Sequence, residues 1–198
     1  MFQFVFQFGY PLMRLVALVG CGTRALPGAA FGPDTAGEPG CARRLLPCPD
    51  SSMVLLADAC YDAYDFMEAV TGTGASFLLR STRKRRPAVR RPLPDGSCLT
   101  TACAGKYQAG RGCGRLGVRI AEARMTVTLA DGTRRSELWR LMTSLLDAES
   151  HPARELTTQY HRRRHTETCY FSLKSTILGG RVLRSRAIPG LEQEVYAC

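Results

Sequence analysis

Apolar and polar residues alternate at the beginning of the chain, and that period of two predicts a β-strand. Phenylalanine occupies every second position from Phe2 to Phe8, which would give the strand one aromatic face. Two further strands are expected over Leu12–Val19 and Thr23–Phe31, joined through Gly20-Cys21-Gly22.

The next apolar run is uninterrupted, as expected of a strand that is buried on both faces. It covers Met53–Ala57, and Asp58 follows it directly. Ligands bind at the carboxyl ends of strands in open α/β sheets, so Asp58 is a candidate ligand-binding residue. The alternative is that Asp58 caps the following helix, although Asp62 is better placed for that task. The neighbouring predicted elements are a short helix over Cys41–Leu46, a helix over Asp62–Val70 and a strand over Ala75–Leu79.

Basic residues crowd the next segment, RSTRKRRPAVRRP, which holds seven of them between Arg80 and Arg91. Two prolines make it a loop or a sheet edge rather than a helix. Such a run is usually a solvated surface. Arginine can also contact phosphate in bidentate fashion, so nucleic-acid contact is an equally strong interpretation. The residues that carry this interpretation are Arg83, Lys84, Arg85 and Arg86.

The rest of the middle third is predicted to be mostly β. Hairpin turns are expected at Asp95-Gly96 and Asp131-Gly132. Strands are expected on either side of the second turn, over Arg119–Leu129 and Trp139–Leu145. Trp139 is the single tryptophan. It could stack on a flipped base, but a lone tryptophan in a strand is more often part of a core.

A long helix is predicted over His151–Leu178, with Ser150 as its cap and Gly179-Gly180 as its stop. Four residues on it, at spacings of three, four and seven, fall within an arc of ~60°. They are Tyr160, Arg163, Glu167 and Lys174. From spacing alone, the simplest interpretation is an Arg163–Glu167 salt bridge on a solvated face.

Composition narrows the classes of function. The net charge of +10 over 198 residues favours a polyanionic partner, most plausibly nucleic acid, although an acidic membrane surface would also suit it. Nine cysteines without C-x-x-C spacing fit neither a disulfide framework nor a zinc ribbon, and indicate a reduced, cytoplasmic protein. Pro11 and Arg14 break the first apolar run well short of the ~20 residues that span a bilayer, so no membrane association is expected.

The order of these segments resembles the DDE transposases of bacterial insertion sequences, in the class marked by the signature Y-x2-R-x3-E-x6-K. Tyr160, Arg163, Glu167 and Lys174 match that signature. The segment LLADACYDAYDF is similar to the strand-ending aspartate segment of the family. Flanking segments in family order extend the resemblance from Pro11 to Tyr196. This resemblance outweighs the simple salt-bridge interpretation.

The resemblance implies a fold of the α/β class with a mixed sheet. Its catalytic core would be RNase H-like, with a β-rich insertion before the final long helix. The implied division is a partial core over 1–79, the insertion with its basic run over 80–146 and the rest of the core over 147–198. Because the first family aspartate has no counterpart, the first strand of the core is expected to be missing and the chain to be a truncated or degenerate copy.

The resemblance also implies the chemistry. Asp58 and Glu167 would be catalytic metal ligands, while Tyr160, Arg163 and Lys174 would bind the DNA backbone near the scissile phosphate. Cleaving and rejoining phosphodiesters uses two Mg²⁺ (or Mn²⁺) ions about 4 Å apart, and these hard ions prefer carboxylate ligands. The implied partner is double-stranded DNA at transposon ends, bound by a homodimer, with the protein in the cytoplasm at the nucleoid.

Two other functions stay open. One is a non-catalytic, basic DNA-binding remnant without a metal site. The other is a basic RNA-binding protein, which is weaker because the sequence has neither an RNP-type aromatic motif nor a KH-type loop.

Overall fold

The computed structural model describes residues 2–8, 10–82, 85, 88–104, 114–128, 131–163, 190 and 193. The chain divides into two compact units. The first unit comprises Met1–Cys48 with Arg162–Cys198, and the second comprises Pro49–His161. The predicted boundaries after residues 79 and 146 both fall within the second unit, and that three-part division stays a prediction.

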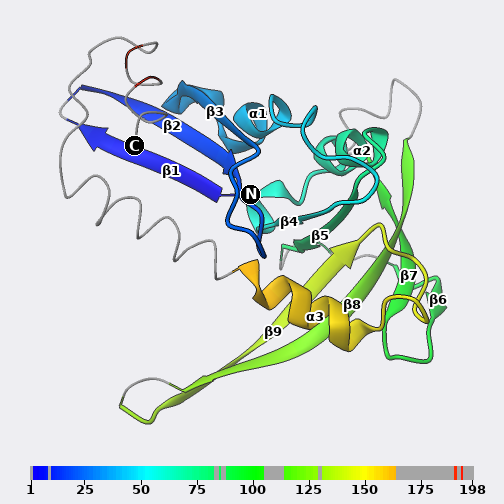
Figure 1. Ribbon diagram of the computed structural model, residues 1–198. Coiled ribbons are helices and arrows are strands. Elements are labelled where there is room, and N and C mark those ends of the chain that lie inside the picture. Colours follow the sequence, from blue (N-terminus) through cyan, green and yellow to red (C-terminus); the bar gives the residue numbers. More distant parts are fainter. Residues whose placement is uncertain are drawn as a thin grey trace. The chain divides into compact units, whose positions relative to one another are not determined.

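The first unit contains a three-stranded antiparallel sheet in the order β1-β2-β3 (Figure 1). The predicted strand at the beginning of the chain is confirmed. The strand expected over Thr23–Phe31 begins later than predicted, after Pro27. Proline has no N–H to donate to the strand ladder. The short helix begins earlier than predicted, because Pro39 suits a first helical turn. The elements are β1 Phe2–Phe8, β2 Tyr10–Leu18, β3 Gly28–Pro33, η1 Asp34–Ala36 and α1 Glu38–Arg43.

The second unit contains a six-stranded sheet in the order β4-β5-β9-β8-β7-β6 (Figure 1). β4 and β5 are parallel, and the other neighbours are antiparallel. This confirms a mixed α/β class with a partly parallel sheet, whereas the RNase H-like fold stays a prediction. The strands are β4 Val54–Ala57, β5 Ser76–Arg80, β6 Arg91–Pro92, β7 Cys98–Cys103, β8 Arg115–Thr128 and β9 Arg134–Thr143.

β4 differs from the expectation of a strand buried on both faces. Within the described residues it lies at an edge of the sheet, and Val54 is 43% exposed. Leu55 and Ala57 are buried. The uninterrupted apolar run therefore belongs to an edge strand, because periodicity reports apolar character but not the number of neighbouring strands.

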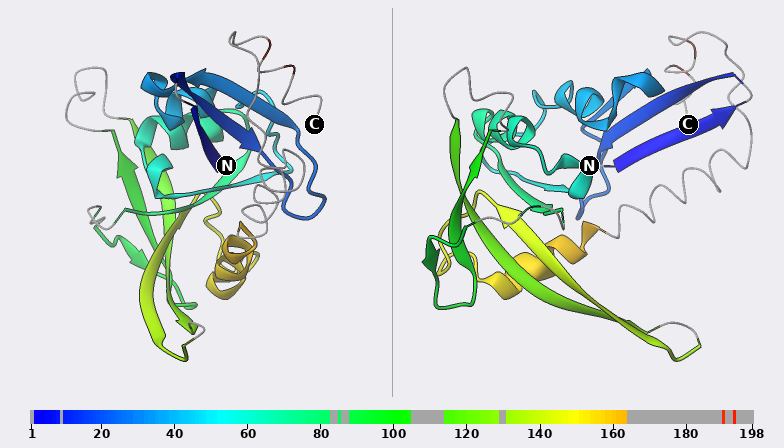
Figure 2. Two further views of the ribbon diagram at one scale, coloured as in Figure 1. Left: turned by 90° about the vertical axis from the view of Figure 1, so that its left-hand side faces the viewer. Right: turned by 180° about the vertical axis from the view of Figure 1, so that it is seen from behind.

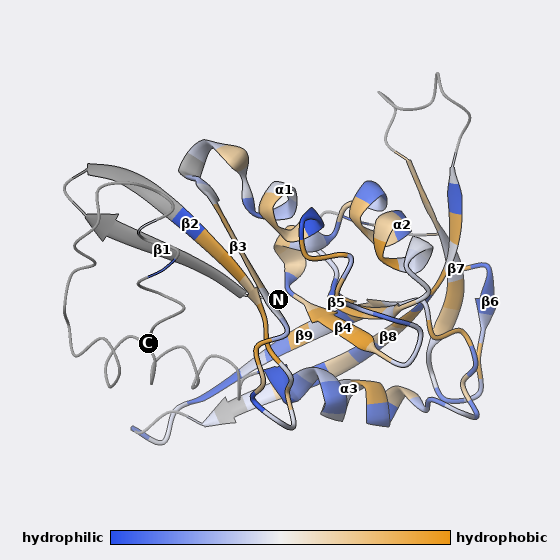
Figure 3. Cartoon of the chain, turned by 45° about the horizontal axis from the view of Figure 1, so that its top comes forward, coloured by the Kyte–Doolittle hydropathy of each residue, from blue (hydrophilic) through white to orange (hydrophobic). Residues whose placement is uncertain are grey.

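Helices lie on both sides of this sheet (Figures 2 and 3). Leu78 and Leu141 form a buried cluster with Leu156 and Tyr160 of the last helix. Because side chains alternate along β5, Phe77 and Leu79 lie on the side of the sheet opposite to Leu78. On that side α2 covers the strand. The helical elements are η2 Ala59–Tyr61, α2 Tyr64–Gly72 and α3 Ala153–His161. None of the helices in the described ranges is long and apolar enough to cross a membrane.

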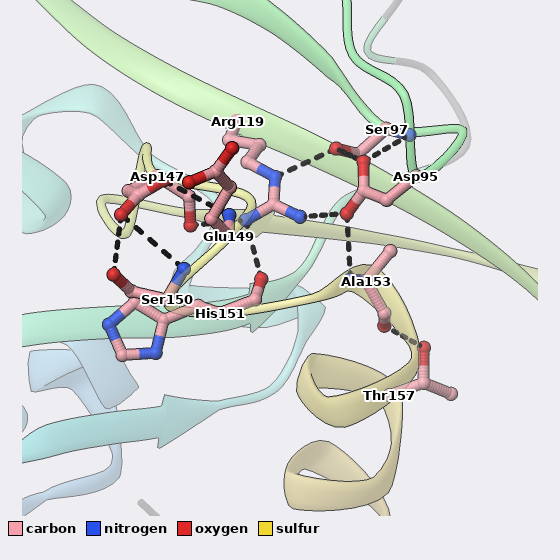
Figure 4. A network of polar contacts seen from close by, with 9 residues as sticks. All are labelled: Asp95, Ser97, Arg119, Asp147, Glu149, Ser150, His151, Ala153 and Thr157. Carbon is pink, nitrogen blue, oxygen red and sulfur yellow. Dashed lines mark hydrogen bonds and ion pairs between the residues drawn. The ribbon is translucent and has the colours of Figure 1, made fainter.

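A fully buried arginine joins three segments of the second unit (Figure 4). Arg119 of β8 donates from Nε to Ser97 Oγ (2.8 Å) and from Nη2 to the Asp95 carboxylate. Its Nη1 donates to the carbonyl oxygens of Asp147 (3.1 Å) and His151 (2.7 Å). Because a buried guanidinium without partners is very costly, these bonds fix the β6–β7 turn, β8 and the approach to α3 relative to one another.

The predicted cap of α3 is wrong. Ser150 donates its hydroxyl to Asp147, and this bond, with the N–H of Glu149, lowers the pKa of Asp147. The helix begins at Ala153, whose N–H donates to Asp95 Oδ2 at 2.8 Å. The cap thus comes from a turn that is distant in sequence, which local patterns cannot show. The predicted end of the helix at Leu178 lies outside the described residues.

Asp95→Asn should lower the free energy of unfolding by about 3 kcal/mol, because it leaves the charge of Arg119 buried without a counterion. Asp131→Asn is the matched control, since Asp131 occupies the other Asp-Gly turn and is exposed. The control should change stability by less than about 0.5 kcal/mol. Urea denaturation measures both values, and equal effects of the two substitutions would refute the role given to the buried pair.

Asp95 should also make stability depend on pH. Burial alone would raise its pKa, but bonds from Ser97 and Ala153 and the charge of Arg119 lower it from 3.8 to about 2. The stabilisation is therefore complete above pH 4 and is lost as pH falls through 2, a loss of about 2 kcal/mol. Urea denaturation between pH 5 and 2 should show this loss in the wild type. The same loss in Asp95→Asn would assign it to other groups.

Candidate nucleic-acid interface

The parallel strands β4 and β5 bring their carboxyl ends to one edge of the sheet. Asp58 follows β4 there and is half-buried. Its Oδ1 accepts a hydrogen bond from the N–H of Ala59 at 2.6 Å, which caps η2. The preference for Asp62 as the cap is wrong, because α2 begins only at Tyr64 and its N-cap residue makes no side-chain bond. Metal ligation by Asp58 stays a prediction.

Asp62 instead forms a buried ion pair at the start of the basic run. Its side chain is 0% exposed, and Arg85 Nε lies 2.7 Å from its Oδ1. Its Oδ2 accepts from the Ser81 hydroxyl (3.1 Å) and from the N–H of Thr82 (2.7 Å). The Arg85 carbonyl in turn accepts from Arg140 Nη1 at 3.0 Å. The loop after β5 is therefore held to the sheet edge at Arg85.

This pairing changes the role of one predicted DNA contact. The guanidinium of Arg85 is bound to a protein carboxylate, so in this arrangement it anchors the loop. Arg83, Lys84 and Arg86 lie outside the described residues, and their DNA contacts stay predictions. Arg90 and Arg91, further along the run, are exposed. A basic run of this kind thus mixes anchoring and exposed residues, which composition cannot separate.

Tyr160, the first signature residue, belongs to the core. Its side chain is 2% exposed, and its ring meets Trp139 edge-on with centroids 5.6 Å apart. Trp139 packs against the same cluster, as expected for a lone tryptophan in a strand. Arg80 lies over the Trp139 ring, 5.0 Å from its centroid, and also pairs with Glu137. Because the Tyr160 side chain is buried, it does not contact the DNA backbone directly in this arrangement.

The other signature residues are only partly covered by the structure. Arg163 is half-buried and lies at the end of the continuous described segment. Glu167 and Lys174 lie outside the described residues. The predicted assembly of Asp58 with Glu167, and the phosphate contacts of Arg163 and Lys174, therefore stay predictions.

The described carboxylates near Asp58 do not by themselves form a Mg²⁺ site. The described ranges contain no group of three or more His, Cys, Asp or Glu side chains that could hold a metal ion. Asp62, the next carboxylate after Asp58 in the chain, is already bound by Arg85, Ser81 and Thr82. Glu167, the other predicted metal ligand, lies outside these ranges.

The arginines of the second unit fall into two groups. Four of those described pair with carboxylates, namely Arg80, Arg85, Arg119 and Arg140. The other seven in its described part are exposed and make no ion pair there: Arg90, Arg91, Arg115, Arg124, Arg134, Arg135 and Arg154. The exposed group is the basic surface on which a polyanion could be held.

Sequence reasoning missed most of this surface. It concentrated on the dense run between Arg80 and Arg91, whereas Arg115, Arg124, Arg134 and Arg135 are spread over two strands. A strand alignment could have found them, because the Asp131-Gly132 turn sets which residues of the two strands face each other.

Arg85→Gln should lower the free energy of unfolding by roughly 2–3 kcal/mol, because it leaves the buried Asp62 carboxylate without its cation. Arg90→Gln is the control, since Arg90 is exposed and its side chain pairs with no described carboxylate. Its effect should be below about 0.5 kcal/mol. Thermal or urea unfolding gives both values. A stable Arg85→Gln protein with weakened DNA binding would reverse the assignment of Arg85 as an anchor.

No protein-family model matches this chain, and no curated protein matches it either. The resemblance to the DDE transposases therefore depends on the residues of this sequence themselves. Of the four signature residues, Tyr160 and Arg163 lie within the described part.

Proposed function

We propose that this protein binds duplex DNA as a domain of the DDE transposase type. The observation that carries the proposal is the set of seven exposed arginines in the second unit, none paired with a described carboxylate. The net charge of +10 agrees with it. The Y-x2-R-x3-E-x6-K signature adds the class of reaction, which would be metal-dependent phosphodiester cleavage and strand transfer.

Exposed arginines suit this task for a physical reason. Each arginine that neutralises a phosphate releases condensed counterions from the duplex, so binding is strong at low salt and weakens as salt rises. Arginines already paired with a carboxylate gain much less, because they would have to give up that partner. The division of the arginines into paired and exposed groups therefore separates structural cations from those available to DNA.

The catalytic part of the proposal rests on Asp58 and Glu167. These two carboxylates would hold Mg²⁺, which supplies Lewis-acid activation of the attacking and leaving oxygens. Arg163 and Lys174 would neutralise phosphates beside the scissile bond. We assign Tyr160 to supporting α3, because its side chain is buried.

A second candidate function is a DNA-binding protein without catalysis. The observation in its favour is that Asp62, the next carboxylate after Asp58 in the chain, is bound by Arg85. Both candidates share the DNA-binding surface and differ only in cleavage.

Replacing Arg83, Lys84 and Arg86 by alanine should flatten the dependence of log K on log salt. The slope should fall by roughly 0.9 for each phosphate contact that is lost. Arg85 is left intact so that stability is not affected. Fluorescence anisotropy with a labelled duplex over a salt series measures the slope. An unchanged slope would remove this run from the DNA-binding surface.

Cleavage separates the two candidate functions. A catalytic domain of the proposed type should nick a duplex in Mg²⁺ or Mn²⁺, provided that a further hard ligand joins Asp58 and Glu167, whereas the non-catalytic candidate binds the duplex without nicking it. Gel analysis of a supercoiled plasmid detects nicking. Metal-dependent nicking that Glu167→Gln abolishes and Glu149→Gln leaves intact would establish catalysis and a further ligand.

A further inference from the structure

The paired part of β8 and β9 continues well beyond the rest of their sheet (Figures 1 and 2). β7 pairs with β8 as far as Ile120, and β5 pairs with β9 from Leu141. Seven further pairs follow, from Glu122 opposite Arg140 to Thr128 opposite Arg134. Within the described residues this stretch, here called the ribbon, is two-stranded. At about 3.4 Å per residue it is roughly 20 Å long.

Burial accounts for the inner part of the ribbon, where Trp139 packs against the core cluster, but not for its outer part. Its outer residues Thr126, Thr128 and Ser136 are exposed, and Leu138 is 52% exposed. Figure 3 shows the outer part of β9 largely in the blue of hydrophilic residues. A two-stranded ribbon with little apolar burial is marginal in water. A surface that contributes so little to the core is suited to contact with another molecule.

The register gives one face of the ribbon a defined chemistry. Residues directly opposite one another, and alternate residues along a strand, project to the same face. Arg124 lies opposite Leu138, and Arg134 lies opposite Thr128. Between them lies the pair Thr126 and Ser136. This face therefore presents two guanidinium groups with hydroxyl groups between them.

The pairing of charged side chains also differs between the inner and the outer end of the ribbon. At the inner end, Arg140 pairs with Glu122 and Arg80 pairs with Glu137. Arg124, one pair closer to the core than Glu137, and Arg134 and Arg135 at the outer end are exposed and make no ion pair with any described residue. The outer end is therefore available to an anionic partner. Arginines there also disfavour edge-to-edge strand pairing, which argues against a second copy as the partner.

We propose that the ribbon lies in the major groove of duplex DNA, an inference that rests on the DNA-binding function proposed above. The major groove is about 12 Å wide and admits a two-stranded β-ribbon. Strands about 4.8 Å apart, with their side chains, fill that width. Arg124 and Arg134 point with Thr126 and Ser136 toward the base edges, and Arg135 reaches a flanking phosphate. Guanidinium groups suit the O6 and N7 acceptors of guanine.

Methylation protection tests this placement, because dimethyl sulfate modifies guanine N7 in the major groove. The wild-type chain should protect guanines in a bound 20-bp duplex. Arg124→Gln with Arg134→Gln should abolish that protection but leave the slope of log K against log salt nearly unchanged, because these arginines contact base edges and not phosphates. The control is Arg24→Gln with Arg43→Gln in the first unit, which removes the same charge and should retain both. Circular dichroism checks that the variants are folded.

The outcomes separate the two proposals. No binding of the wild-type chain to the duplex would overturn the proposed function and the ribbon placement together. Binding without N7 protection, or equal behaviour of the ribbon and control variants, would overturn the ribbon placement alone. A ribbon variant that changes only the mass measured by light scattering would show that the ribbon joins two copies of the chain, which also overturns the placement.

Discussion

The second unit depends on one buried guanidinium. Arg119 is 0% exposed and binds groups from the β6–β7 turn and from the segment before α3. Asp95 balances its charge and also accepts the first N–H of α3. A single carboxylate therefore sets both the charge balance and the start of the helix that covers the sheet. Because the interior penalises any unpaired charge, these segments must fold together.

A similar principle operates at the end of β5. Asp62 is buried and binds Arg85, Ser81 and Thr82, which ties the basic loop to the sheet edge where Asp58 lies. In both places an arginine serves the fold because a carboxylate has been buried beside it. The seven described arginines of the second unit that pair with no described carboxylate are exposed. The paired arginines are thus distinguished from the exposed ones by the positions of four carboxylates.

Local patterns predicted much of the fold and little of the site. The strand at the chain start, the strand before Asp58 and the two Asp-Gly turns were found because period-two alternation, apolar runs and turn residues act over short distances. The Asp95 cap and the Asp62–Arg85 pair join residues 58 and 23 positions apart, which no local pattern reports. The outer ribbon was missed in part because both of its faces carry polar residues. Its strand β9 begins at Arg134, before the predicted Trp139.

Hydrogen–deuterium exchange with and without a duplex tests the central claim most directly, since it locates the bound surface on the intact chain. The ribbon and the loop around Arg90 should exchange more slowly when DNA is bound. The segment around Asp95 and Arg119, already held by buried bonds, should exchange at the same rate in both states. DNA-dependent protection confined to the first unit, with the ribbon unchanged, would contradict the account.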